Sequence, residues 1–298
     1  MIARGSVSLV ALALAFASSG CKGKEQTEIP SVEVPVRSPT AGDALLEMAP
    51  AGADAVLEID LLRLRKNDTV GPLVNALAQE DMGGFDVFRD ADQIVICSYA
   101  IGTDDAAQIL MLRGASVSSI DGAHAIADDV VVVTTAAMLE KIRAVRNGAA
   151  SVASQEKLMR ARAMAMPPAA DGATLRVAAT LGFDARVAVA KQLRVDAVPI
   201  SISVWGDVAD DMAIVALLGG EDRKEGKSLA SAARRARDRY SATPTARRLL
   251  YGYVLRLAKV ESQGSLAKVT LIIGPKRLSN LVRRLMKRIG VVQSEKAS

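Results

Sequence analysis

Apolar and polar residues alternate in two stretches of this chain that align with each other without a gap. The stretch from Ile94 to Gly114 aligns with that from Ile200 to Gly220, and seven of 21 positions are identical. In each, an alternating apolar run is followed by a pair of aspartates and then by a second apolar run that ends at Gly. This pattern predicts a strand, a tight turn and a second strand. We therefore predict that the chain contains a duplicated unit, in which these two hairpins are equivalent.

The elements on either side of the hairpins are duplicated as well. A predicted strand and helix precede each hairpin, and a strand and an amphipathic helix follow it, in an alignment that places Leu139 on Leu278. A unit of this order forms an antiparallel sheet with helices packed on one face. We predict an α+β fold of two tandem repeats of this kind, residues 44–150 and 170–292. A connecting helix is expected within residues 151–169.

The second repeat contains an insertion that the first repeat lacks. Because Gly114 aligns with Gly220 but Leu139 aligns with Leu278, the second repeat is longer after its hairpin, and the additional residues are expected at residues 221–253. Their pattern predicts two helices, the second capped by Thr243 and opened by Pro244. The insertion contains a Gly-Lys-Ser sequence that begins at Gly226, but the earlier glycine that a phosphate-binding loop requires is replaced by Glu221. We therefore expect no nucleotide site.

The amino terminus, residues 1–20, indicates an export signal. A short positive start, an uninterrupted apolar run and small residues precede Cys21. The apolar run is about half of the roughly 20 residues that a membrane-spanning helix needs. The position of Cys21 resembles the site at which bacterial lipoproteins are cleaved and lipidated; cleavage after Ala17, with Cys21 unmodified, is the alternative. Residues 21–43 are expected to be a flexible, proline-containing tether, and residues 293–298 a disordered tail.

Charge is distributed unequally along the chain. Residues 223–298 contain 19 Lys and Arg against 4 Asp and Glu, a net charge of +15, whereas residues 1–222 contain 19 against 29, a net charge of −10. A field of this shape attracts an anionic partner to one end of a protein. The candidate anion-binding residues are cations of the insertion and of the final helix: Arg234, Arg235, Arg237, Arg247, Arg248, Arg283, Arg284 and Lys287.

The sequence leaves three explanations of this basic segment open. It is a solvated surface, or it binds anionic lipid headgroups or an acidic envelope polymer, or it contacts the acidic first repeat. Nucleic acid is not expected as a partner because aromatic residues make up only 3% of the chain, too few to stack on bases, and because the protein is expected to be exported.

No catalytic or metal-binding pattern is recognisable. His124 is the only histidine, and Cys21 and Cys97 are the only cysteines. We expect His124 to have a structural role and Cys97 to be a small buried apolar residue. The paired aspartates lack the alternating spacing of a calcium-binding loop and are expected in solvated turns. The sequence therefore predicts a non-catalytic protein without cofactor or metal.

The run APAGADAVLEIDLLRL, with the segments VFRDADQIVIC and ILMLRG that follow it, is similar to a group of uncharacterised bacterial envelope lipoproteins built from repeated α+β units. The resemblance covers most of the chain after the signal peptide. It implies export and architecture, and no catalytic residue.

Three hypotheses of function follow. The first is a lipid-anchored protein on the periplasmic side of the cell envelope that acts by binding through its basic second repeat. The second is a structural subunit that assembles head to tail with copies of itself or with another envelope protein through charge asymmetry. The third is an enzyme of unrecognised type. Lys22 stands where an Asp is usually linked with retention in the inner membrane, so the outer membrane is slightly favoured.

Overall fold

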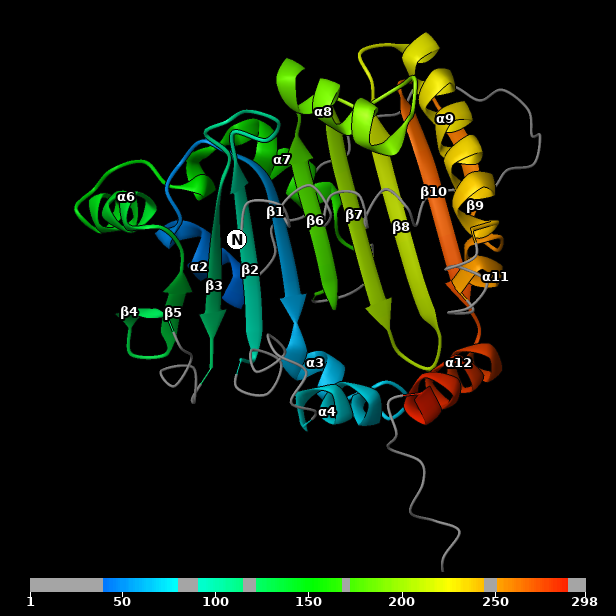
Figure 1. The fold of residues 1–298 in the computed structure, drawn as a ribbon, viewed down its shortest axis with the longest axis horizontal. Helices are drawn as coiled ribbons and strands as arrows, with labels where there is room; N and C mark the ends of the chain where they lie inside the picture. Colours follow the sequence, from blue (N-terminus) through cyan, green and yellow to red (C-terminus); the bar gives the residue numbers. More distant parts are fainter. Residues whose placement is uncertain (1–39, 80–90, 115–121, 168–171, 244–250, 289–298) are drawn as a thin grey trace, which may run out of the picture.

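A single continuous sheet runs through both repeats (Figure 1). The computed structural model describes residues 40–79, 91–114, 122–167, 172–243 and 251–288. Every strand of the described sheet is antiparallel to its neighbours, and the order is β4-β5-β3-β2-β1-β6-β7-β8-β10-β9. The strands are β1 (Ala53–Asp60), β2 (Gln93–Tyr99), β3 (Ala107–Arg113), β4 (His124–Ala127), β5 (Val130–Val133), β6 (Leu175–Thr180), β7 (Ser201–Val208), β8 (Met212–Gly219), β9 (Lys259–Gln263) and β10 (Leu266–Ile273).

The two halves of the sheet have the same strand order when they are followed outward from the centre. There β1 pairs with β6, and β2, β3, β5 and β4 on one side correspond to β7, β8, β10 and β9 on the other. The predicted hairpins are β2–β3 and β7–β8. Ile96 pairs with Leu110 in the first hairpin, and its counterpart Ile202 pairs with Leu218 in the second. Leu218 lies two positions after the residue that aligns with Leu110. The turn of the second hairpin is therefore centred one position later than the alignment alone would place it. The α+β fold of two repeats is confirmed.

Helices surround the sheet, and α2 and α3 are additional to those that the sequence predicts. A reciprocal capping box between Thr40 and Asp43 begins α2, so the end of the predicted tether belongs to a helix. Thr135 caps α6 in the same way that Asp222 caps α9, by accepting a bond from a backbone N–H in the first turn. The helices are α2 (Ala41–Met48), α3 (Leu61–Arg65), α4 (Gly71–Gln79), α6 (Ala136–Arg146), η3 (Val152–Ser154), α7 (Glu156–Met164), α8 (Phe183–Leu193), α9 (Arg223–Ser241), α11 (Tyr251–Leu255) and α12 (Pro275–Arg288).

Two hydrophobic cores lie on opposite sides of the sheet. On the first side, here called the α6 face, α2, α6 and α7 cover the first repeat, with a core that includes Leu45, Ile142, Leu158, Val95 and Met111. On the other side, the α9 face, α8, α9, α11 and α12 cover the second repeat, with a core that includes Val189, Leu229, Ala233, Ile202 and Leu271. The helical layer of each repeat therefore lies mainly on one face, and the two layers lie on opposite faces.

The last strand and helix of the second repeat are turned over relative to those of the first. Met111 of β3 pairs with Val132, and its counterpart Leu217 of β8 pairs with Lys268. In the sequence alignment of β5–α6 with β10–α12, however, the counterpart of Val132 is Leu271, three positions after Lys268. Because side chains alternate along a strand, a shift by an odd number of positions exchanges its two faces. Consequently α12 packs on the α9 face, although its counterpart α6 packs on the α6 face.

This exchange leaves an apolar surface on the α6 face of the second repeat, here called the open sheet face. Its members are the partly buried Trp205, Val215 and Leu217, together with Ile272, which is 56% exposed. Their counterparts in the first repeat are buried: the residues equivalent to Trp205, Val215 and Leu217 are Tyr99, Ile109 and Met111, which are at most 8% exposed. Equivalent residues are therefore covered in the first repeat and accessible in the second.

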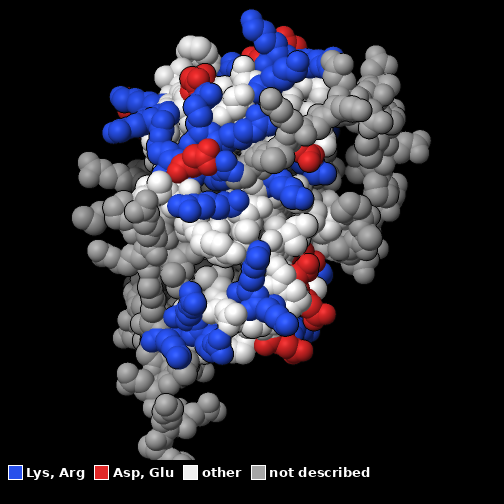
Figure 2. Space-filling view, turned by 90° about the vertical axis from the view of Figure 1, so that its right-hand side faces the viewer, with Lys and Arg blue, Asp and Glu red and all other residues white. Residues whose placement is uncertain are grey.

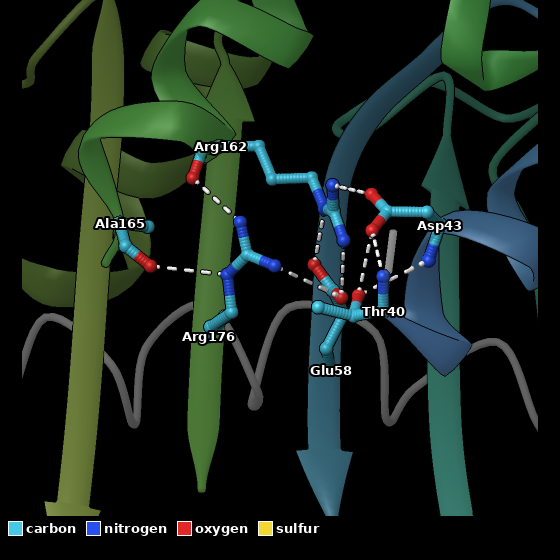
Figure 3. A network of polar contacts seen from close by, with 6 residues as sticks. All are labelled: Thr40, Asp43, Glu58, Arg162, Ala165 and Arg176. Carbon is cyan, nitrogen blue, oxygen red and sulfur yellow. Dashed lines mark hydrogen bonds and ion pairs between the residues drawn. The ribbon is translucent and has the colours of Figure 1, made fainter. Parts of the chain in front are cut away.

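Charged side chains join the two repeats on the α6 face (Figure 3). Arg162 of α7 donates from Nε and Nη2 to the two carboxylate oxygens of Glu58 in β1, at 2.6 and 2.8 Å, and also to Asp43 of α2. Arg176 of β6 lies 3.6 Å from the same Glu58 carboxylate and donates to two backbone carbonyls near the end of α7. Glu58, Arg162 and Arg176 are at most 6% exposed, so these charges compensate one another away from water.

The capped start of α2 completes this network. A Cβ atom on Gly42 would lie 2.2 Å from a carboxylate oxygen of Glu58, so a side chain there would displace Glu58 from its present position. Burial by itself would raise the pKa of Asp43, but the hydrogen bonds from Thr40 and the charge of Arg162 outweigh it and lower the pKa. Asp43 is therefore held ionised as part of the contact between the repeats.

A second ion pair joins the repeats where β1 ends and β6 begins. Arg63 of α3 donates to both carboxylate oxygens of Asp207 in β7, at 3.0 and 2.8 Å, and Thr174 donates to the same carboxylate at 2.6 Å. Asn67 also donates to two backbone carbonyls at the end of β7. These contacts and the network around Arg162 connect the two repeats at two separate places.

Several expectations concern residues outside the described ranges. These are the signal peptide, Cys21, most of the tether, Pro244, Arg247, Arg248 and the tail. The predicted insertion is present as α9 and α11, and the predicted connecting helix as α7. No helix among the described residues has the length and apolar character that are needed to cross a membrane.

Cys97 provides a direct test of the first core. Its side chain is fully buried in β2, as the sequence predicts, and burial raises the pKa of its thiol to about 12. In a Cys21→Ser chain, Cys97 is the remaining thiol, and Ellman's reagent at pH 8 measures how fast it reacts. We expect the folded chain to react at least about a thousandfold more slowly than the chain unfolded in guanidinium chloride. The reason is that the Cys97 side chain is buried and little of it is ionised to the reactive thiolate at this pH. Comparable rates in the two conditions would contradict the burial of β2.

Candidate anion-binding site

Helix α9 carries the site and is fixed to the sheet by small residues. Asp222 caps it by accepting a hydrogen bond from the Glu225 backbone at 2.8 Å, and its buried side contains four alanines. A Cβ on Gly226 would lie 2.4 Å from the carbonyl oxygen of Gly264, so the helix can approach the β9–β10 turn only with glycine there. The Gly-Lys-Ser sequence is therefore part of a packed helix, and its glycine serves that packing.

An open pocket of about 630 Å³ lies along the first turns of α9. We call it the cationic pocket. Residues three or four positions apart share one side of a helix, which brings lysine, arginine and serine side chains of α9 together above the loop that follows α8. The lining residues are Arg223, Lys224, Lys227, Ser228, Ser231 and Arg235 of α9, with Asp196 and Ala197 of the loop.

The charges of the cationic pocket are only partly compensated. Arg235 donates to both oxygens of Asp196, at 2.5 and 2.8 Å, and this hydrogen bond lowers the pKa of the Asp196 carboxyl group. Lys224 and Lys227 are exposed and form no ion pair with any residue that the structure describes. Two lysines without an ionic partner among the described residues thus stand beside two serine hydroxyls. Such a set of donors suits phosphate, sulfate or carboxylate oxygens.

The structure separates the arginines that the sequence proposed together. Arg235 lies in the cationic pocket, but Arg234 donates to the Val260 carbonyl at 3.0 Å and so holds α9 to β9. Arg237 is largely buried, with its side chain 16% exposed, and pairs with Asp238 at 2.6 Å. Arg234 and Arg237 therefore contribute to packing, and neither lines the cationic pocket. Arg247 and Arg248 lie outside the described residues.

A second group of cations lies on α12, at the other end of the same side of the molecule. Figure 2 shows Lys and Arg side chains gathered over the upper part of this side, where α9 lies, and over the lower part, where α12 lies. Arg283 donates to Asn280, and Arg277 stands over the ring of Tyr253, 5.8 Å from its centre. Arg284 and Lys287 are exposed as predicted.

Sequence reasoning missed most of the cationic pocket. Arg223, Lys224 and Lys227 belong to the basic segment but are not among its predicted anion-binding residues, because the charge density is highest among the arginines further along α9. The useful signal was spacing: Lys224, Lys227, Ser231 and Arg235 recur every three or four positions and so share one side of α9. Asp196 and Ala197 join the pocket only through folding.

The other residues considered for catalysis or metal binding lie away from the cationic pocket. His124 is exposed on the short edge strand β4, away from the pocket. The described residues contain no group of three or more His, Cys, Asp or Glu that could hold a metal ion. The side chains of Asp104, Asp105 and Asp210 are exposed beyond the strand ends of the two hairpins.

Comparison with known proteins adds only a distant likeness. No model of a protein family matches the chain, and no curated protein matches it by sequence. Crystal form I of TP0453 aligns with a TM-score of 0.42 and 10% sequence identity, over 80% of this chain and 97% of that chain. At this distance the likeness carries no statement about function.

Proposed function

We propose that this protein is a non-catalytic, lipid-anchored envelope protein that binds anionic lipid headgroups through the basic surface of its second repeat. The observation that carries the proposal is the cationic pocket, in which Lys224 and Lys227 stand exposed without an ionic partner among the described residues. Cations placed near an anionic membrane surface each contribute about 1 kcal/mol to binding.

The arrangement of the two cationic groups favours a membrane surface over a small soluble anion. The pocket on α9 and the exposed cations of α12 occupy the same side of the protein, separated along its height (Figure 2). The ion pairs that the basic segment makes with Asp196 and Asp238 stay within the second repeat. An extended anionic surface can contact both groups together, which a single small anion cannot.

Sedimentation with vesicles tests this function. We expect the unlipidated chain from Lys22 to Ser298 to bind vesicles of phosphatidylglycerol and phosphatidylcholine, not vesicles of phosphatidylcholine alone, and to dissociate between 50 mM and 500 mM NaCl, because salt screens exposed charges. Equal binding to both vesicles would exclude the proposal. Preferential binding of soluble polygalacturonate in a competition would instead support an acidic polymer as partner.

A structural role in an envelope complex is the second candidate, and the open sheet face favours it. Trp205, Val215, Leu217 and Ile272 are accessible apolar side chains on this face, beside Lys268 and Thr270, and accessible apolar groups of this kind commonly mark protein contacts. If this role is the correct one, sedimentation velocity will show association that increases with protein concentration, and vesicles will not bind. If the protein stays monomeric at all concentrations and binds anionic vesicles, the structural role is excluded and lipid binding is retained.

A further inference from the structure

Helix α8 exposes two large apolar side chains beside the cationic pocket. Phe183 is 73% exposed and Val187 is 51% exposed, although the same helix buries Ala185, Val189 and Leu193 in the core. Phe183 and Val187 are four positions apart and so stand on one side of the helix, away from the sheet. Adjacent exposed apolar side chains of this kind are available to contact an apolar group of a ligand.

These side chains line a groove that continues into the cationic pocket. The groove has a volume of about 380 Å³ and runs between α8 and the start of α9. It shares Asp196, Ala197 and Ser228 with the pocket, so the two form one depression. Its apolar lining consists of Phe183, Val187, Ala190, Ala197, Val198 and Leu229.

The exposed lysines and the exposed apolar side chains occupy different parts of this depression, although Arg186, Asp196 and Glu225 also line the groove. Lys224 and Lys227 line the cationic pocket and are absent from the lining of the groove, whereas Phe183 and Val187 line the groove alone. The carboxylates near the boundary are already engaged, since Asp196 accepts from Arg235 and Glu225 accepts from the backbone of Glu221 at 2.7 Å. The depression therefore offers the same molecule a cationic end and an end where apolar side chains predominate.

We propose that this depression binds one anionic amphiphile, with its phosphate in the cationic pocket and its alkyl chain along Phe183 and Val187. The inference rests on the proposed function and specifies the ligand of the same surface: a single lipid with a phosphate head and at least one accessible chain. The narrow crevice beneath the groove holds only about 30 Å³, so the chain lies in the open groove. Neither a free phosphate nor an uncharged chain satisfies both ends.

Calorimetric titration of the chain from Lys22 to Ser298 tests the proposal with three probes. Dodecyl phosphate, below its critical micelle concentration, carries both the anion and the chain. Glycerol 3-phosphate has the anion alone, and dodecyl maltoside has the chain alone. We expect dodecyl phosphate to bind with one-to-one stoichiometry and at least about tenfold more tightly than either comparator, because each comparator leaves one end unfilled. A comparator that binds as tightly as dodecyl phosphate overturns the proposal.

Two substitutions separate the ends of the site. Phe183→Ser is expected to weaken dodecyl phosphate about tenfold and to leave glycerol 3-phosphate unchanged, whereas Lys224→Gln weakens both. Ile272→Ser is the matched control, since Ile272 is also exposed and apolar but lies on the open sheet face. Unchanged affinity for dodecyl phosphate in Phe183→Ser, or an equal loss in Ile272→Ser, overturns the placement of the chain. Equal melting temperatures of the three variants establish that folding is not the cause.

The vesicle experiment distinguishes failure of this inference from failure of the proposed function. Salt-dependent binding of anionic vesicles together with no preference for dodecyl phosphate rejects the groove and retains the membrane surface. Selective binding of dodecyl phosphate without vesicle binding rejects the membrane surface and retains a site for a single amphiphile.

Discussion

Replacement of Arg162 with Met is expected to lower the free energy of unfolding by about 3–5 kcal/mol. Arg162 makes both hydrogen bonds of a bidentate pair with Glu58 and a third with Asp43, and its side chain is 6% exposed. The substitution leaves the buried Glu58 with Arg176, at 3.6 Å, as its remaining charged neighbour. The loss is large because a buried carboxylate without its partner cannot be rehydrated while the repeats stay together. Urea denaturation followed by circular dichroism measures it.

Arg160→Met is the matched control on the same helix. Arg160 pairs with Glu156 at 2.7 Å, but both side chains are more than 70% exposed, so the expected change is below about 0.5 kcal/mol. The double substitution Glu58→Met with Arg162→Met should cost less than the sum of the two single substitutions, because it removes both charges. Similar losses for Arg160→Met and Arg162→Met, or strictly additive losses in the double variant, would contradict the buried network.

The combined substitutions Lys224→Glu and Lys227→Glu are expected to weaken binding to anionic vesicles at least about thirtyfold. Each lysine near the membrane contributes about 1 kcal/mol, so removal of two charges alone costs about 2 kcal/mol, and the introduced carboxylates add repulsion. Both side chains are exposed on α9, away from the core, so the fold should be unaffected. Vesicle titrations at 50 mM NaCl give the apparent Kd.

Lys141→Glu with Arg146→Glu provides a control with the same change of net charge. These residues are exposed on α6 in the first repeat, on the other face of the sheet from α9. If binding depends on the cationic pocket, this variant retains most of its affinity. An equal loss in both variants would show that overall charge, and no particular site, attracts the protein to the membrane.

The duplication could be read from the sequence because its signal is local. Alternation within Ile94–Gly114 and Ile200–Gly220 depends only on which side of a strand each residue occupies, and the gapless alignment repeats that pattern. The strand order in the two halves of the sheet agrees with it. Helices α6 and α12 begin at Ala136 and Pro275, which are equivalent in the alignment that places Leu139 on Leu278. The number of residues between the strand and the helix that follows it is likewise set by the local sequence.

The candidate site was predicted less well. The sequence indicated that positive charge is concentrated in the second repeat, and Arg235, Arg284 and Lys287 are exposed in that repeat. It could not show that Arg234 and Arg237 turn toward β9 and Asp238, because composition does not distinguish an arginine that packs from one that is free. A neighbour such as Asp196, far before Arg235 in the chain, reaches the site only through folding.

By itself, the sequence determined the two repeats, the strands and helices within each, and the excess of positive charge in the second. Only the tertiary structure decided how β10 registers on β8, and hence that α12 lies on the α9 face and that the open sheet face is accessible. The same is true of the groove between α8 and α9. Local patterns fix which residues share a side of a strand, whereas strand register and helix docking depend on contacts between segments far apart in the chain.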